Sequence, residues 1–372
     1  MTLADLGTVL KLTTGGIIGA VLYWSLYGRE KTEDEINRDR ENSAHSNSGN
    51  IGLNSSGSFR HKRSRSGSNL TSSTGGGGDS NAQLIDLLHN TMIEYILNEK
   101  TSHVITIDST ATLDYALMRM NENQVISLPV VDLSTKQYIG MLSIVDIAAF
   151  LSQFPSEDSP NTPVSEVLKY NRVPFLPLYV NSPIQMLIHV MAHHVPQVPI
   201  MSRQTIVVDI VSRLNVLSFI NENIEALGNK ANSSIKSLDL LSKTISTVNQ
   251  NSKVIEAINL MNVEQTTELA VIDDEGKIVG NFSAADLRKL SIYSFNRCYE
   301  PISKFITLEP ENLNIVIPST TLRSTICKFV ENDAPILWIV DNQMKPVSSI
   351  THIGLMKYLL NLSTSLSDTS TI

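Results

Sequence analysis

One amphipathic pattern occurs four times along the chain at nearly constant intervals. In each copy, apolar side chains stand at positions i, i+3, i+4 and i+7, the spacing of one face of an α-helix, with a Thr at one place in the fourth copy. The four patterns start at Leu113, Ile184, Val254 and Leu322, so they are 71, 70 and 68 residues apart. Such a regular period restricts the fold to a repeat architecture.

Each predicted helix is followed by two short apolar runs of the kind that form β-strands. The second run ends at a hydroxyl residue, after which a second helix is expected. These hydroxyl residues are Ser143, Ser212, Ser283 and Thr351. The pattern predicts an α/β fold in which every copy has the order strand, helix, strand, strand, helix.

The first and third copies are the most similar pair. Gly140, Ser143 and Asp146 stand 140 residues before Gly280, Ser283 and Asp286. The chain is therefore also expected to be a tandem of two larger units, near 89–225 and 230–365.

These features identify a family resemblance. The order of elements, the period near 70 and the segments 139–147 (IGMLSIVDI) and 279–287 (VGNFSAADL) resemble the CBS (cystathionine-β-synthase) domain. Four such repeats without a catalytic domain resemble the γ subunit of AMP-activated (sucrose non-fermenting type) protein kinase. The resemblance implies two Bateman modules, each a pair of repeats, with the repeats at 92–154, 164–225, 233–294 and 301–363.

The resemblance also implies a class of ligand. Clefts between paired CBS repeats commonly bind AMP, ADP, ATP or S-adenosylmethionine, and the Ser/Thr-x-x-Asp motif contacts ribose and phosphate. Ser143 with Asp146 and Ser283 with Asp286 match the motif in full; the degenerate copies have Ser212 with Asn215, and Thr351 without an acid. A Ser three residues before an acid is also close to a capping box at a helix start, so a structural role is the alternative.

Basic residues that would neutralise phosphate are missing where the γ subunits have them, before the first apolar strand. The third copy has Glu268 there, which would repel phosphate. His193 and His194 are candidate phosphate contacts, with a favourable position near a helix C-terminus as the alternative. Other possible cations for phosphate, most of which are expected to be solvated, are Arg119, Lys136, Arg213, Arg288 and Arg323.

The N-terminal part differs in composition from the repeats. Residues 12–28 are uncharged and apolar, and their length is at the lower limit for a membrane-spanning helix, so we expect an anchor; a soft apolar tail that docks on protein is the alternative. Residues 29–88 are rich in Ser, Asn and Gly and are expected to be a disordered linker. Ser64, Ser66 and Ser68 lie among basic residues as candidate phosphorylation sites, with an unmodified solvated stretch as the alternative.

Charge and motif content restrict the function. Residues 83–372 carry 20 Lys/Arg and 29 Asp/Glu, a net charge of −9, which argues against nucleic acid as the main partner. The two cysteines cannot form a disulfide framework, which favours a cytoplasmic body. The sequence has no catalytic motif and no metal-ligand spacing, and we expect neither an enzyme nor a required cofactor.

The leading interpretation is a regulatory protein that senses adenosine-containing ligands and modulates a protein partner, with kinase subunits as candidates. The alternative is a membrane-tethered CBS scaffold or dimerisation module that has lost nucleotide binding and that associates with itself or with a partner.

Overall fold

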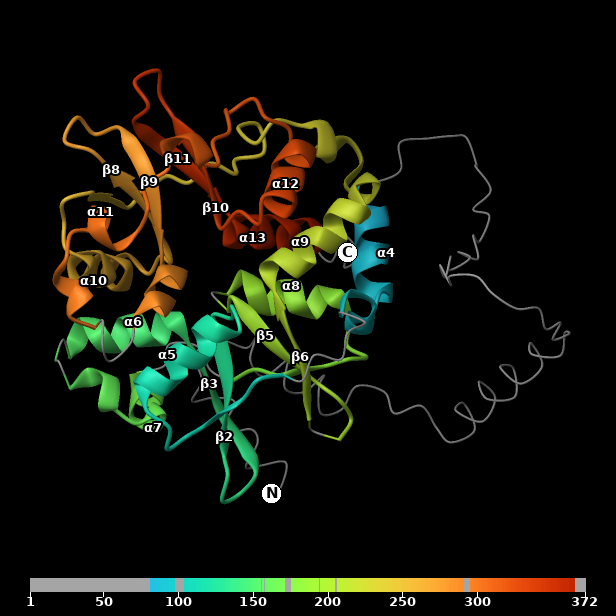
Figure 1. Cartoon of the computed structure of the whole chain (residues 1–372). Helices are drawn as coiled ribbons and strands as arrows, with labels where there is room; N and C mark the ends of the chain where they lie inside the picture. Colours follow the sequence, from blue (N-terminus) through green and yellow to red (C-terminus); the bar gives the residue numbers. More distant parts are fainter. Residues whose placement is uncertain are drawn as a thin grey trace, which may run out of the picture. The chain divides into compact units, whose positions relative to one another are not determined.

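The chain folds into four similar α/β units (Figure 1). The computed structural model describes residues 81–97, 104–154, 156, 158–170, 175–193, 195–204, 206–290 and 295–364. The predicted order of elements is confirmed in the first two units, which are the strand–helix–strand–strand–helix repeats expected from the apolar pattern.

The elements of the four repeats follow in chain order. Repeat 1 consists of β1 (Ile107–Asp108), α5 (Leu113–Glu122), β2 (Ser127–Asp132), β3 (Gln137–Ser143) and α6 (Ile144–Gln153). Repeat 2 consists of β4 (Leu178–Tyr179), α8 (Ile184–Ala192), β5 (Gln197–Met201), β6 (Val207–Ser212) and α9 (Arg213–Glu222). Repeat 3 consists of β7 (Thr247–Asn249), α10 (Val254–Glu264), β8 (Glu268–Ile272), β9 (Ile278–Ser283) and the 3-10 helix η5 (Ala284–Lys289). Repeat 4 consists of α12 (Leu322–Glu331), β10 (Ile336–Val340), β11 (Pro346–Thr351) and α13 (His352–Thr364).

The remaining helices lie before the repeats or between them. They are α4 (Ala82–Asn90), α7 (Val164–Val167), α11 (Ile302–Phe305) and the 3-10 helices η1 (Ile93–Ile96), η2 (Ser159–Asn161), η3 (Leu168–Tyr170), η4 (Ile224–Asn232), η6 (Phe295–Tyr299) and η7 (Pro310–Asn312).

Each small sheet is built the same way. In repeats 1 to 3 the middle strand pairs in parallel with the first strand and antiparallel with the third. The two antiparallel strands shift register at one equivalent place in all four repeats, between Val130 and Val131 in repeat 1. Where the connecting turn begins with Asp132, Asp273 or Asp341, the carboxylate accepts a hydrogen bond from a backbone N–H two residues later. This Asx turn fixes the hairpin in repeats 1, 3 and 4.

Two repeats depart from the predicted order. In repeat 4 the first strand is reduced to a single parallel bridge between Ile315 and Trp338, so its sheet has two strands. In repeat 3 the second helix is the short 3-10 helix η5 rather than an α-helix. The apolar pattern alone does not distinguish these shortened elements from full ones.

Repeats 1 and 2 form one module by exchanging short backbone bridges. Met92, ahead of repeat 1, bridges Pro183 at the start of α8, and Thr112, at the start of α5, bridges Pro163 ahead of repeat 2. The side chain of Ser127 also donates a hydrogen bond to that of Gln197, 70 residues later. Repeats 3 and 4 exchange the same bridges, through Ser234 with Thr321 and Lys253 with Pro301.

Helices join the two modules. Helix α6 of repeat 1 packs against α10 of repeat 3, while α8 and α9 of repeat 2 pack against α13 and α12 of repeat 4 (Figure 1). One continuous core contains buried side chains of both repeat 1 and repeat 3, including Leu117, Ile147, Ile258 and Leu287. A structural change in one module would therefore alter the packing of side chains in the other module.

The predicted linker 29–88 is too long at its C-terminal end. Helix α4 begins at Ala82, and its Leu84 and Leu88 are buried. Its leucines recur at a helical spacing of four residues and so share one face, and the helix packs against η4, α8 and α13.

The predicted anchor 12–28, the rest of the linker and Ser64, Ser66 and Ser68 lie outside the described residues. Within the part of the chain that is described, no helix is both long enough and apolar enough to cross a bilayer.

Candidate functional site

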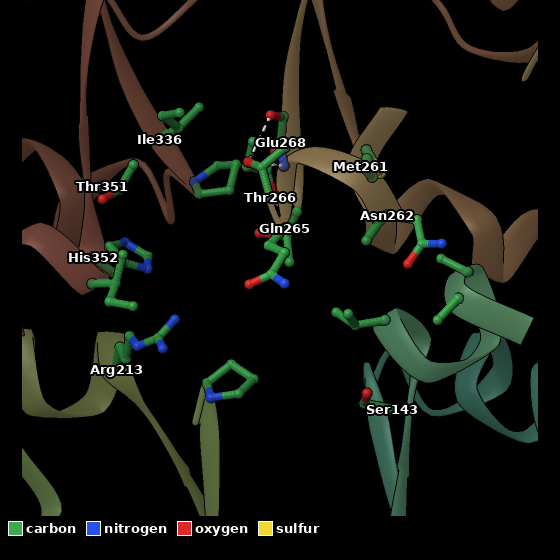
Figure 2. A pocket seen from close by; sticks show the side chains of 18 residues that line it. Ser143, Arg213, Met261, Asn262, Gln265, Thr266, Glu268, Ile336, Thr351 and His352 are labelled. Atoms are coloured by element: carbon green, nitrogen blue, oxygen red, sulfur yellow. Dashed lines mark hydrogen bonds between the residues drawn. The ribbon is translucent and has the colours of Figure 1, made fainter. Parts of the chain in front are cut away.

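A cavity of about 610 Å³ lies where the four repeats meet (Figure 2). Its volume falls within the range of small-molecule sites in proteins. All four repeats contribute to its lining, which is formed by Ser143, Val145, Ala148, Ala149, Pro196, Arg213, Met261, Asn262, Gln265, Thr266, Thr267, Glu268, Ala284, Pro335, Ile336, Thr351, His352 and Ile353.

The repeat architecture explains why these residues meet. In every copy a hydroxyl residue ends the last strand and accepts a backbone hydrogen bond from the first turn of the second helix. The residue after this hydroxyl is the first helical one, and in three copies it lines the cavity: Arg213, Ala284 and His352. The N-termini of these second helices therefore gather around one space, and helix N-termini favour negative charge.

Arg213 supplies a positive charge to this cavity. Its Nε and Nη2 donate to the carbonyl oxygen of Met191 at 3.2 and 3.1 Å. Burial lowers the pKa of the guanidinium to about 10, so it remains charged at neutral pH. No carboxylate of the described residues lies within ion-pair distance of it.

His352 lies close to Arg213 in the cavity wall. Its ring packs on Phe329, with centroids 4.6 Å apart. Burial, with a smaller effect from the nearby Arg213 charge, lowers the pKa of the imidazole to about 4, so the ring is neutral at pH 7. Its Nε2 is buried and has no hydrogen-bond partner among the described residues. We call Arg213 and His352 the basic side of the cavity.

Glu268 lies on a different part of the wall, at the start of β8 (Figure 2). Its two carboxyl oxygens accept hydrogen bonds from Oγ of Ser283 at 2.9 Å and from Nδ2 of Asn281 at 2.7 Å. Burial raises the pKa of this carboxyl to about 8, and these two hydrogen bonds only partly oppose the rise. Glu268 is therefore mostly protonated at neutral pH, so the repulsion of phosphate expected from the sequence is weak there.

The two intact motifs serve as capping boxes. The Oδ2 of Asp146 accepts hydrogen bonds from the backbone N and the Oγ of Ser143, at 2.8 and 2.6 Å, and Asp146 is 1% exposed. Ser143 lines the central cavity, whereas Asp146 lines a second cavity of only about 30 Å³. A space of that size is far below the volume of a nucleotide site. In this conformation the cleft beside Asp146 has no room for a ribose.

The motif of repeat 3 is arranged in a similar way. The backbone N of Ser283 donates to Oδ2 of Asp286 at 2.9 Å, while Oγ of Ser283 donates to Glu268. The other carboxylate oxygen of Asp286 pairs with Lys289 at 3.0 Å. The sequence-derived motif is thus largely engaged by the chain's own groups.

The remaining predicted site residues divide into two groups. Ser212 and Asn215 form a capping box on α9, and Thr351 accepts from the backbone N of Gly354 at 3.1 Å while lining the cavity. His193 is exposed at the end of α8, where its Nδ1 hydrogen-bonds to the carbonyl oxygen of His189 at 2.7 Å. His193 lines neither cavity, and His194 lies outside the described residues.

Sequence reasoning missed the role of Arg213 and His352. It named Arg213 only as one of five possible cations, most of them expected to be solvated, and gave no role to His352. The missing signal was positional: both residues directly follow the hydroxyl residue that caps the second helix. The four copies have Ile144, Arg213, Ala284 and His352 at this place, so two of four first helical residues are basic.

Comparison with known proteins supports the repeat assignment. Segments 97–153 and 237–293 match the family model of the CBS domain. These two segments are similar to CBS domains. The two matches coincide with the first and third copies, the pair that is most similar in sequence.

Three relatives show how far this similarity extends. Protein sds23 of Neosartorya fischeri is 28% identical over 158 residues, covering 38% of this chain and 29% of that protein. Protein SDS23 of Saccharomyces cerevisiae is 25% identical over 224 residues, covering 52% of this chain and 42% of that protein. This chain thus spans less than half the length of these fungal relatives. Protein MJ1225 of Methanocaldococcus jannaschii is 24% identical over 276 residues, covering 68% of this chain and 95% of that protein.

A solved structure has a similar fold over most of this chain. The crystal structure of MJ1225, described as a proposed archaeal homologue of γ-AMPK, aligns with a TM-score of 0.59 and 21% identity. The alignment covers 72% of this chain and 99% of that one. The fold is therefore that of tandem CBS repeats.

Proposed function

We propose that this protein is a non-catalytic regulatory subunit that binds an adenosine-containing ligand with an acidic group in the central cavity. One observation carries the proposal: Arg213 places a charged guanidinium in this cavity with no described carboxylate to neutralise it. A charge that is partly removed from water and has no counterion is costly, and an acidic ligand group would offset that cost.

The surroundings of Arg213 support an acidic ligand. The unpartnered Nε2 of His352 can donate a hydrogen bond to an acidic group once the ring is protonated, which such a group favours. The helices α9 and α13 both start at the cavity, so their dipoles also favour an anion. AMP, ADP, ATP and S-adenosylmethionine are the candidate ligands, following the resemblance to CBS proteins.

The packing of the modules suggests how binding would be transmitted. The cavity is lined by all four repeats, and repeats 1 and 3 share a core. A ligand that prefers one arrangement of the repeats would shift the population toward it and change the outer surface offered to a protein partner. Kinase subunits are the candidate partners by analogy with the γ subunit, to which MJ1225 has been compared.

Isothermal titration with the four candidate ligands tests the proposal. We expect at least one to bind the full chain, and Arg213→Met to weaken that binding about tenfold or more, because a charge-assisted hydrogen bond is lost. Arg203→Met, which removes an exposed arginine of the same module, is the matched control and should bind like the wild type. Asp146→Ala is less suitable, since it also breaks the capping box of α6.

Two results would reject the proposed function. One is that none of the four ligands binds the wild type; the other is that Arg213→Met binds as tightly as the wild type. Thermal melting of each variant, compared with the wild type, separates a lost contact from a lost fold.

A scaffold without a ligand is the second candidate, and one observation favours it. The cleft beside the intact Ser143–Asp146 motif holds only about 30 Å³, and the Ser127–Gln197 hydrogen bond lies across it between the two repeats. A stable partner in pull-downs, with melting temperatures unchanged by every candidate ligand, would select the scaffold.

A further inference from the structure

Arg213 and Glu268 both line the central cavity and do not neutralise each other. For Arg213, burial alone accounts for the lowered pKa. For Glu268, burial raises the pKa, hydrogen bonds from Asn281 and Ser283 partly oppose the rise, and the charge of Asp286 adds to it. Figure 2 shows Arg213 near His352 and Glu268 on another part of the wall, and no ion pair joins Arg213 to Glu268 among the described residues. The two charges therefore belong to separate parts of one cavity.

An acidic side chain at the start of the middle strand occurs only in repeat 3, as Glu268. Each copy has an equivalent residue at the start of its middle strand, and the other three are Ser127, Gln197 and Ile336. Only the third can become negatively charged. Because Glu268 is 9% exposed and lines the cavity, its carboxyl group is available to a bound molecule but shielded from bulk water.

The two sides of the cavity need opposite ligand groups. Arg213 and His352 favour an acidic group, whereas Glu268 favours a cation, which would convert its protonated carboxyl into a carboxylate–cation pair. One ligand that carries both groups would offset the desolvation of both protein groups at once. A ligand with several negative charges and no cation would leave Glu268 without a partner and would oppose its ionisation.

We propose that the cavity selects a zwitterionic ligand, with its acidic group against Arg213 and His352 and its cationic group against Glu268. This inference rests on the proposed function, because it assigns the ligand of the same cavity. Glu268 is then the residue that determines the preference for a zwitterion over a polyanion.

A matched pair of probes isolates the cationic contact. S-adenosylmethionine and S-adenosylhomocysteine share the nucleoside, the carboxylate and the ammonium group, but only the first carries a sulfonium charge, so the pair tests the sulfonium as the cation that contacts Glu268. We expect the full chain to bind S-adenosylmethionine about tenfold more tightly than S-adenosylhomocysteine, and either of them more tightly than ATP. In Glu268→Gln the ratio between the first two should fall to about one.

Proton release gives a second readout that a purely structural role of Glu268 would not produce. With a pKa of about 8, Glu268 is about nine-tenths protonated at pH 7, so pairing with a cation releases up to about 0.9 proton. Titrations in buffers of different ionisation enthalpy measure this release. It should be absent in Glu268→Gln and retained in Glu264→Gln, a matched control in which the removed acid is exposed at the end of α10.

Protonation of the other titratable groups must be separated from that of Glu268. Asp286 acts on Glu268 from η5, and His352 lies on the basic side, where an acidic ligand raises its pKa and takes up protons. Repeating the titration with His352→Gln removes that uptake. The release due to Glu268 should persist in this variant.

Each outcome decides the inference. The inference is supported if Glu268→Gln binds S-adenosylmethionine and S-adenosylhomocysteine with about equal affinity and releases no proton on binding. An unchanged ratio in Glu268→Gln, or tightest binding of ATP that depends on Arg213 but not on Glu268, would overturn it and leave the proposed function intact. If no probe binds the wild type, both fail.

Discussion

Raising the pH should destabilise this protein through Glu268. The folded chain buries this carboxyl and raises its pKa from the ordinary 4.5 to about 8, so the folded state holds a proton that the unfolded state releases. The resulting stabilisation is fully present below pH 4.5 and is lost as the pH rises through 8. His352 has the opposite dependence. Its pKa is lowered from 6.5 to about 4, so its contribution is present above pH 6.5 and is lost as the pH falls through 4.

The window above pH 6.5 therefore isolates Glu268 from His352. Between pH 6.5 and pH 9, a carboxyl with these folded and unfolded pKa values lowers the free energy of unfolding by about 2 kcal/mol. Burial raises the pKa of Cys298 to about 12, so this thiol adds its own loss of stability only near the upper end of the range.

Urea unfolding of the wild type and of Glu268→Gln at several pH values measures this contribution. The variant should lose about 2 kcal/mol less than the wild type across the window, because the introduced amide cannot ionise. The substitution is expected to be tolerated: Oγ of Ser283 can accept a hydrogen bond instead of donating one, and Oδ1 of Asn281 is buried with no partner among the described residues. Parallel pH profiles of the two proteins, within about 0.5 kcal/mol, would refute the reasoning.

Two further predictions concern the fold and the N-terminal region. Gly280→Ala should destabilise the protein by about 1–2 kcal/mol in urea unfolding, because the added Cβ would lie 2.7 Å from Cδ2 of Leu308. The equivalent Gly140→Ala should cost less, since its closest contact is 3.2 Å from Leu168, and equal losses would contradict this comparison. For the predicted anchor, the full chain should stay with membranes in carbonate extraction while a chain without residues 1–28 is released. Release of both would reject the anchor.

The sequence predicted local structure well where one apolar face or one cap decides it. The quartet that begins at Leu113 is fully buried on α5. The hydroxyls from Ser143 to Thr351 accept hydrogen bonds at the helix starts, which is the structural role named as the alternative for this motif. The sequence did not predict that the first strand of repeat 4 is only a single bridge, or that the second helix of repeat 3, η5, is a 3-10 helix. Those outcomes depend on packing with neighbouring repeats, which the period does not encode.

The prediction of the site was partial for a similar reason. The Ser/Thr-x-x-Asp motif correctly marked the strand-to-helix junctions, and Ser143 and Thr351 do line the cavity. It did not distinguish a carboxylate that faces a ligand from one that caps its own helix. In Asp146 the capping role occupies one oxygen with two hydrogen bonds from Ser143, and the adjoining space is small.

The sequence by itself determined the repeat, most of the elements within each copy and the junctions at which they meet, because each of these depends on neighbouring residues. Only the tertiary structure decided which side chains share a cavity. Arg213, Glu268 and His352 come from three different repeats, and their separation along the chain says nothing about their distance in space. Burial then gave these groups their properties, keeping Glu268 protonated and His352 neutral near pH 7, since desolvation exists only once the four repeats have packed.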